Sequence, residues 1–192
     1  MIGVTAASDD AEASRAAAPA ATIPTAPGGA TIPKPDGMLT PANNAGAGTG
    51  PGAARQATKH VFPLPAKHTY GDGFGAGRGH QGQDIFAKCG KKIVAARGGK
   101  VQYSGYHADA GNYVVIDGRQ TDWDYVYMHM KKTGIAKEGE RLSEGDLVGF
   151  NSDTGNASGC HLHFEMWDPS GWYEGGRAKS PTKFLKSWDA YS

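Results

Sequence analysis

The sequence predicts a mostly-β, antiparallel domain over residues 58–192, preceded by a low-complexity tail and ending in a short helix. Three observations support this prediction. Glycine accounts for 29 of 192 residues, about twice its usual level of about 7%, and 21 of the 29 lie after residue 57. Short alternating apolar runs are separated by glycines, and only the last segment has a helical pattern. Glycine enrichment within the domain is typical of turn-rich β structure.

Residues 1–57 form the predicted tail. Alanine, glycine and proline make up 32 of these 57 residues, and the first aromatic residue of the chain is Phe62. Such a segment cannot bury enough apolar surface to offset the entropy lost on ordering. We expect a disordered tail or linker that ends before residue 58. Residues 1–8 are too short and too weakly apolar for a signal peptide, so they are either the stump of one or an ordinary gene start.

Six strand-like runs follow the tail. The pattern predicts strands over 93–96, 100–106, 112–117, 124–130, 146–150 and 160–167. The only helical pattern lies at the end of the chain. There, Ser180 is the expected N-cap, Pro181 the first helical residue, and Thr182–Trp188 the remaining turns.

Composition excludes several classes of function. Lys and Arg number 20 and Asp and Glu number 19, which gives a formal charge of +1 and argues against charge-driven binding to nucleic acid. No apolar run approaches the roughly 18–20 residues that a membrane span needs. Two cysteines are too few for a four-cysteine zinc finger or a disulfide-dense miniprotein.

Histidines near the end of the chain are candidates for chemistry. In the run 161–165, the two-residue period of a strand places His161, His163 and Glu165 on one face and turns the residues between them into the core. Two imidazoles on a rigid strand can then point at the same small volume. The alternative is a pair of surface histidines with no shared ligand.

Two further groups join this pattern. His80 and Asp84 are four residues apart, and the glycine between them lets the backbone bend so that both side chains converge. His129 lies on an alternating strand, and the period predicts that it shares the face of Tyr125 and Tyr127. Imidazole nitrogens combined with a carboxylate are a donor set that suits Zn²⁺ with an open fourth position.

Four separated motifs, in order and spacing, resemble those of the lysostaphin/LytM-type zinc metallopeptidases. They are His80-x-x-x-Asp84, residues 111–116 (GNYVVI), residues 127–130 (YMHM) and residues 154–165 (TGNASGCHLHFE). The similarity covers roughly residues 60–170. It implies a fold of the duplicated-hybrid-motif type, with a groove over an antiparallel sheet. It also implies hydrolysis of peptide bonds in bacterial peptidoglycan.

The same resemblance assigns roles to individual residues. It implies that His80, Asp84 and His163 hold one Zn²⁺ per chain and that His129 and His161 are catalytic. It does not say which of the two histidines is the general base. Glu165 shares the face of the strand histidines, so it is either a hydrogen-bond partner behind the metal ligands or a structural carboxylate.

The two cysteines lie beside the candidate metal ligands. Cys89 follows Asp84 by five residues, and Cys160 directly precedes His161. A disulfide between them is the expectation; two free thiols or metal ligation are the alternatives. A disulfide implies an oxidising location, which agrees with an extracytoplasmic cell-wall substrate.

Two functions from different classes fit these observations. The first is a monomeric, extracytoplasmic zinc endopeptidase acting on peptidoglycan peptides. The alternative is a non-catalytic wall-binding or regulatory module on the same fold. The presence of all five site residues favours the enzyme.

Overall fold

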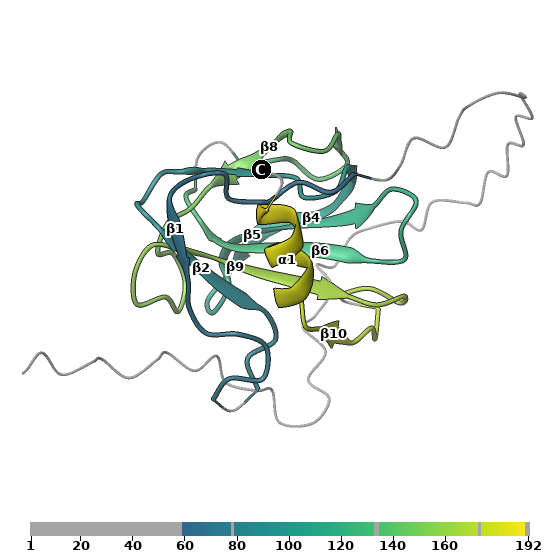
Figure 1. The fold of residues 1–192 in the computed structure, drawn as a ribbon. Coiled ribbons are helices and arrows are strands. Elements are labelled where there is room, and N and C mark those ends of the chain that lie inside the picture. Colours follow the sequence, from purple (N-terminus) through teal and green to yellow (C-terminus); the bar gives the residue numbers. More distant parts are fainter. Residues whose placement is uncertain (1–58, 78, 133–134, 173, 191–192) are drawn as a thin grey trace, which may run out of the picture.

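The computed structural model describes residues 59–77, 79–132, 135–172 and 174–190 (Figure 1). Ten strands and one helix lie within these ranges. Their bounds are β1 His68–Tyr70, β2 Gln83–Ala87, β3 Lys92–Val94, β4 Gly99–His107, β5 Gly111–Gly118, β6 Asp124–Met130, β7 Arg141–Leu142, β8 Leu147–Phe150, β9 His161–Trp167, β10 Ala178–Lys179 and α1 Thr182–Asp189. The mostly-β prediction with one short C-terminal helix is confirmed for the described residues.

The strands form one large antiparallel sheet and one small one. The order in the large sheet is β1-β2-β9-β6-β5-β4-β7, with β10 pairing the end of β9. Strands β3 and β8 form the second sheet. Because β9 comes late in the chain and inserts between β2 and β6, it brings three distant segments side by side.

The six predicted strands correspond to β3, β4, β5, β6, β8 and β9, with bounds that agree to within a few residues. The pattern missed β1, β2, β7 and β10, of which three have only two or three residues. The predicted helix cap was wrong. Pro181 is the N-cap residue and no side chain caps the helix, so Ser180 does not have that role.

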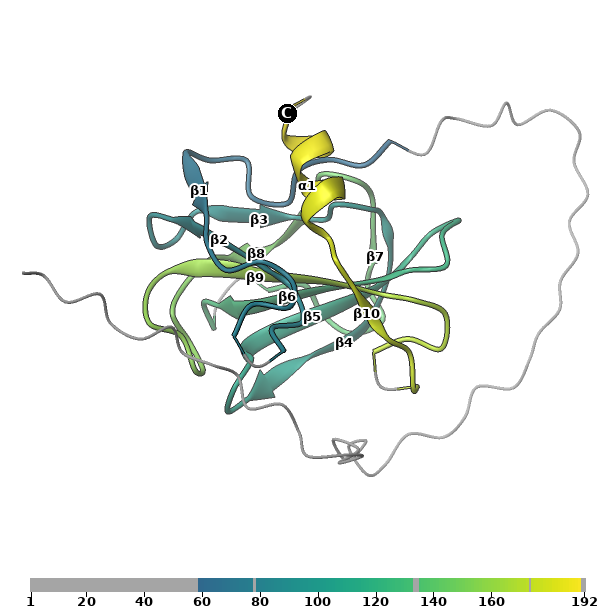
Figure 2. The same cartoon turned by 60° about the horizontal axis from the view of Figure 1, so that its bottom comes forward.

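One face of the large sheet carries the main hydrophobic core. Tyr127 and Phe164 are buried there, with their ring centroids 5.3 Å apart. Leu185 and Trp188 of α1 lie in this core, as do residues of β3, β8 and the segment 62–64. Figure 2 shows how α1 and these strands run. Phe62 and Leu64, which precede β1, are buried in this core.

The opposite face carries a smaller cluster. Val115, Val126 and Met128 are buried in it, and half-buried aromatic side chains pack around them: Tyr103, Tyr113, Trp167 and Trp172. Because β9 alternates, its histidines and Glu165 share this second face, while Leu162 and Phe164 lie in the main core. The candidate site therefore sits on the face away from α1.

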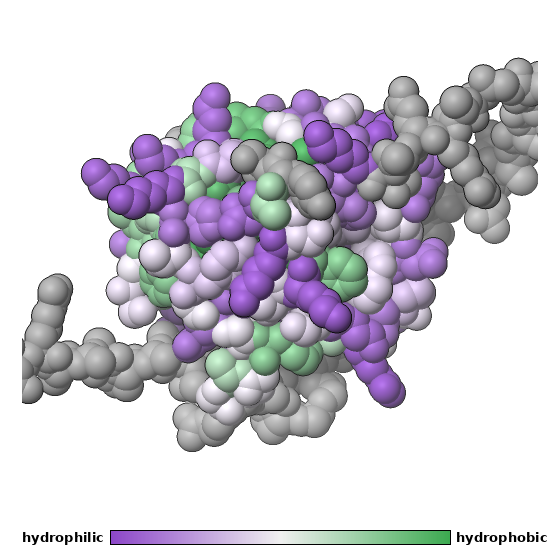
Figure 3. Space-filling model, in the orientation of Figure 1, coloured by the Kyte–Doolittle hydropathy of each residue, from purple (hydrophilic) through white to green (hydrophobic). Residues whose placement is uncertain are grey.

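The side of the molecule drawn in Figure 3 is mostly hydrophilic, with apolar residues in small separate patches. Phe184 of α1 is one of the large apolar side chains exposed in the described residues. Within the part of the chain that is described, no helix has the length and apolar character needed to cross a membrane.

Candidate active site

Strand pairing places the first two site residues opposite each other. In the β2–β9 pair, the Cα of Asp84 is the partner of the Cα of His163. Side chains at directly opposed positions of an antiparallel pair point to the same side of the sheet. The carboxylate and the imidazole therefore meet, and the Asp84 Oδ1 to His163 Nδ1 distance is 2.8 Å.

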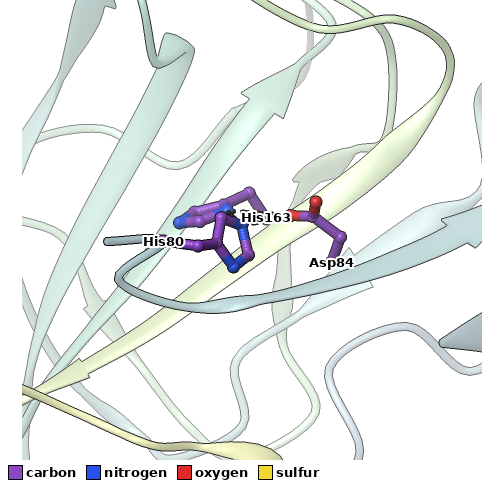
Figure 4. A group of neighbouring side chains, drawn as sticks. All are labelled: His80, Asp84 and His163. Carbon is purple, nitrogen blue, oxygen red and sulfur yellow. Dashed lines mark hydrogen bonds and ion pairs between the residues drawn. The ribbon is translucent and has the colours of Figure 1, made fainter. Parts of the chain in front are cut away.

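His80 reaches this pair from the turn before β2. Backbone hydrogen bonds close this turn, including one from the His80 N–H to the carbonyl of Ala76 at 3.1 Å. His80 Nε2 then lies 3.1 Å from Asp84 Oδ1 and 3.0 Å from His163 Nδ1. Figure 4 shows the three side chains turned toward one another.

The second nitrogen of each imidazole is held by an acceptor. His80 Nδ1–H donates to the carbonyl of Gly73 at 2.9 Å, because a carbonyl oxygen can only accept. His163 Nε2–H donates to Glu165 Oε1 at 2.9 Å. These bonds leave His80 Nε2, His163 Nδ1 and Asp84 Oδ1 as three ligand atoms facing one another.

This cluster fits a divalent metal ion. A proton between three such atoms satisfies at most two of them, whereas a cation satisfies all three. Ligand atoms around a tetrahedral zinc ion lie about 3.3 Å from one another, only a few tenths of an ångström more than the separations here. Two imidazole nitrogens and one carboxylate oxygen also leave a fourth position open, as in catalytic rather than structural zinc sites.

The electrostatics of the cluster favour a positive charge. Burial disfavours the charged carboxylate of Asp84, but its contacts with the imidazoles of His163 and His80 outweigh this effect and hold the Asp84 pKa well below its usual range. Burial also disfavours protonation of His163, yet its hydrogen bonds to Asp84 and Glu165 raise its pKa to about 9. The protein therefore stabilises a cation at the position that a metal would take.

His129 has an unusual backbone conformation. Its φ is 59°, in the left-handed region, which costs a residue other than glycine about 1–3 kcal/mol and persists only where the surroundings enforce it. The pairing of β5 with β6 shifts register nearby. The prediction that His129 shares the face of Tyr125 and Tyr127 was wrong. Those tyrosines lie in the main core, whereas the His129 ring centroid lies 4.6 Å from that of His161 on the other face.

The imidazole rings of His129 and His161 are oriented by the same kind of hydrogen bond, from Nδ1–H to a backbone carbonyl. His129 Nδ1–H donates to the carbonyl of Thr154, and His161 Nδ1–H donates to the carbonyl of Gly159, each at 2.8 Å. When the rings are neutral, Nε2 of each keeps its lone pair. His161 Nε2 lies 3.6 Å from Asp84 Oδ1, so this lone pair borders the ligand cluster.

Both rings are neutral at neutral pH. Burial, reinforced by the neighbouring His161 and His163, lowers the pKa of His129 to about 3. Burial is also the main cause that lowers the pKa of His161. Neutral imidazoles with oriented Nε2 atoms can accept a proton, which is what general-base catalysis requires.

Hydrogen bonds of the Thr154 hydroxyl hold in place the residue whose carbonyl accepts the His129 Nδ1–H. The hydroxyl of Thr154 donates to the carbonyl of Met130 at 2.8 Å and accepts the N–H of Asn112 at 3.1 Å. Gly111, with φ of 64°, packs directly against Thr154, and a side chain at residue 111 would collide with it. The GNYVVI and TGNASG motifs thus meet at His129.

A disulfide joins Cys89 to Cys160, whose Cα atoms are 5.2 Å apart. It connects the segment after β2 to the start of β9, the two strands that carry Asp84 and His163. Both sulfurs are used in the bridge, which excludes the alternatives of free thiols and of cysteine as a metal ligand.

Glu165 lies behind the ligand cluster. It is 2% exposed, and besides His163 it accepts the indole N–H of Trp167 at 2.6 Å. Of the two alternatives for Glu165, the geometry favours the hydrogen-bond partner behind a metal ligand. Sequence reasoning missed Trp167, although its two-residue spacing from Glu165 places both side chains on one face of β9.

The predicted site residues therefore come together in space. His80, Asp84 and His163 form the ligand cluster, and His129 and His161 lie beside it. Their individual roles stay predictions. An antiparallel β domain with a two-histidine, one-carboxylate cluster and two neutral histidines has the arrangement of a metal-dependent hydrolase.

Comparison with known proteins identifies the family. The sequence model of Peptidase family M23 matches residues 78–178, and the chain belongs to this family. The recognised resemblance to lysostaphin-type peptidases is thereby confirmed.

Two curated relatives are peptidoglycan or glycyl-glycine peptidases. The chain is 38% identical over 91 residues to the peptidoglycan DD-endopeptidase ShyC of Vibrio cholerae serotype O1, covering 46% of this chain and 20% of ShyC. It is 32% identical over 115 residues to the glycyl-glycine endopeptidase ALE-1 of Staphylococcus capitis, covering 58% of this chain and 30% of ALE-1. The chain thus spans less than a third of the length of either relative.

Among solved structures, the fold is similar to the catalytic domain of the antimicrobial peptidase lysostaphin from Staphylococcus simulans. The two share 28% sequence identity with a TM-score of 0.56, and the match covers 62% of this chain and 92% of that domain. The similarity therefore includes nearly all of a catalytic domain.

Proposed function

We propose that the protein is a zinc-dependent endopeptidase that hydrolyses peptide bonds in bacterial peptidoglycan. The observation that carries this proposal is the convergence of His80, Asp84 and His163 beside two neutral histidines. Family membership and the named activities of ShyC and ALE-1 support it. Those two relatives are named for different bonds, so the proposal covers peptide stems and cross-bridges alike.

Zinc is the ion that this donor set favours. Imidazole nitrogen suits zinc, copper, iron and nickel, whereas magnesium and calcium prefer oxygen donors. Zinc also tolerates a mixed tetrahedral set with an open position. We propose one zinc ion per chain, held by His80 Nε2, Asp84 Oδ1 and His163 Nδ1.

The catalytic roles follow from the hydrogen bonds. A bound zinc ion would supply Lewis-acid chemistry, polarising a carbonyl and acidifying a water. His129 and His161, each anchored through Nδ1, present Nε2 to the reacting groups. One accepts a proton at Nε2 from the attacking water and returns it to the leaving amine, while the other, once its Nε2 also carries a proton, donates a hydrogen bond to the oxygen on which negative charge develops.

The setting of the enzyme is part of the proposal. A disulfide next to the site suits an oxidising, extracytoplasmic compartment, where the cell wall lies. A monomeric state is also part of the proposal. The groove over the sheet and the domain start near residue 58 also remain proposals.

Hydrolysis of purified cell walls tests the function. Wall suspensions should lose turbidity with the parent protein, stop doing so with a chelator, and recover when zinc is restored. Mass spectrometry of the released fragments should show cleaved peptide bonds and would identify the bond. His129→Ala serves as the matched inactive variant because His129 is outside the ligand cluster. Wall binding without any peptide cleavage would replace the enzyme with the binding module.

A further inference from the structure

The Glu165 carboxylate links a proposed metal ligand to an aromatic ring. Its Oε1 accepts His163 Nε2–H at 2.9 Å and its Oε2 accepts the Trp167 indole N–H at 2.6 Å. The three residues alternate along β9, so all three side chains lie on the site face. Opposite Glu165 on β6 is Val126, which has no polar side chain. Within the described residues, these two N–H groups are the hydrogen-bond donors to the carboxylate.

Each oxygen of Glu165 therefore has one donor. At 2% exposure, an oxygen that lost its donor would not be compensated by bulk water, and leaving a buried acceptor unpaired is costly. A carboxylate without the indole bond loses the contact that fixes Oε2 and is free to rotate. Rotation would weaken the bond that holds His163 in the form with Nε2 protonated and Nδ1 directed at the ligand cluster.

We propose that Trp167 is a positioning residue for the metal centre: its indole N–H fixes Glu165, and Glu165 in turn fixes the orientation and tautomer of His163. This inference rests on the proposed metal-dependent function. Groups behind a metal-binding histidine typically change metal affinity by about 10–100-fold when they are removed. Trp167 is one step further from the metal than Glu165, so its effect belongs at the lower end of that range.

The geometry predicts that substitutions at residues 165 and 167 do not change zinc affinity independently of each other. A glutamine at residue 165 has only one acceptor oxygen for two N–H donors. If its oxygen faces Trp167, its amide NH₂ faces His163 Nε2 and imposes the tautomer in which Nδ1 carries the proton. If its oxygen faces His163, its NH₂ opposes the indole N–H. Removing that indole N–H should therefore relieve part of the damage that Glu165→Gln causes.

Four proteins test the proposal: the parent, Trp167→Phe, Glu165→Gln and the double variant. Zinc affinity is measured by competition with a chromophoric chelator, and the melting temperature of each zinc-free protein shows that it folds. Trp123→Phe is the matched control, since it also removes an indole N–H but packs near Phe184 on the α1 side of the sheet. It should bind zinc like the parent.

The expected result is a zinc affinity about 10-fold weaker for Trp167→Phe and 10–100-fold weaker for Glu165→Gln. The double variant should bind zinc more tightly than Glu165→Gln alone. The proposal is overturned if Trp167→Phe binds zinc like the parent, or if the two effects simply multiply in the double variant. A parent protein that binds no zinc would instead refute the proposed function, so the two failures are distinguishable.

Discussion

The backbone of Gly82 passes directly beneath the ring of His163. A Cβ atom at residue 82 would lie 2.7 Å from His163 Nε2 and 2.5 Å from the carbonyl oxygen of Phe164. The glycine between His80 and Asp84 therefore does more than allow a bend. It makes room for the imidazole that the other two side chains approach.

Gly82→Ala should weaken metal binding because the added methyl group must displace the His163 ring or separate β2 from β9. We expect at least a 10-fold loss of zinc affinity, as for other disturbances of the groups around a metal ligand, and a stability loss of about 1–3 kcal/mol. Chelator competition and urea unfolding measure the two effects. Gly159→Ala is the control, since a Cβ there meets no atom within 4 Å. Unchanged zinc affinity in Gly82→Ala would contradict the tight packing.

Alanine variants should separate the catalytic histidines from the ligand. His129→Ala and His161→Ala should keep zinc and the fold while losing about 10²–10⁴-fold in rate, the usual contribution of general acid–base catalysis. His163→Ala should lose both zinc and activity. Zinc content by elemental analysis and the rate of wall hydrolysis distinguish the cases. If His161→Ala loses zinc while His163→Ala retains it, the roles of these two histidines are exchanged.

The backbone strain at His129 gives a separate test. Glycine adopts φ of 59° freely, whereas alanine in the left-handed region costs about 1–2 kcal/mol. His129→Gly should therefore unfold at higher urea concentration than His129→Ala, although both lack the imidazole and hydrolyse walls equally poorly. Equal stability of the two variants would show that the left-handed conformation is released when the side chain is removed.

Much of the fold was predictable because its longer strands alternate. Strand β6 has the bounds that the pattern predicted, 124–130. Strand β2 was missed because its polar first residues, Gln83 and Asp84, follow a glycine-rich turn and leave only a short apolar run. Strand β1 has three residues at the edge of the sheet, too few for periodicity to register.

The sequence predicted which residues form the site, but it did not predict the direction in which every side chain points. Spacing placed His163 and Glu165 on one face because β9 is regular. At His129 the alternation fails, since a left-handed residue reverses the side-chain direction, and histidine does not mark that conformation as glycine does. The role of Trp167 was hidden for another reason. Apolar patterning treats an indole as a core residue and ignores its N–H group.

Loss of the disulfide should destabilise the domain without removing the metal ligands. Cys89 and Cys160 are 71 residues apart, and a bridge of this span typically contributes about 2–5 kcal/mol, largely by restricting the unfolded chain. The double variant Cys89→Ser, Cys160→Ser should therefore melt at lower temperature yet bind zinc well below its melting point. Non-reducing peptide mapping of the parent checks the pairing. Two alkylatable thiols in protein from its native compartment would contradict it.

The last prediction concerns Asp124, which begins β6 and is 7% exposed. Burial, with help from the carboxylates of Asp117 and Glu174, raises its pKa to about 6, although the N–H of Trp172 donates to it at 3.2 Å. The folded-state pKa therefore exceeds the unfolded value of about 3.9. Between these values the folded protein binds more protons than the unfolded chain, so the contribution of Asp124 to stability falls as pH rises from about 4 to 6. Above pH 6 the ionised carboxylate remains a constant cost.

Asp124→Asn removes this cost while its amide oxygen can still accept the Trp172 N–H. The variant should be more stable than the parent by about 1–2 kcal/mol at pH 8, and the difference should vanish near pH 4, where the parent carboxyl is protonated. Urea unfolding at pH 8, 6 and 4 measures the difference. Asp168→Asn is the control of opposite sign, because the N–H of Arg177 and the ammonium of Lys179 lower the Asp168 pKa. That variant should be no more stable than the parent at pH 8. A destabilised Asp124→Asn at pH 8, or a difference independent of pH, would show that the charge on Asp124 is compensated in the folded protein.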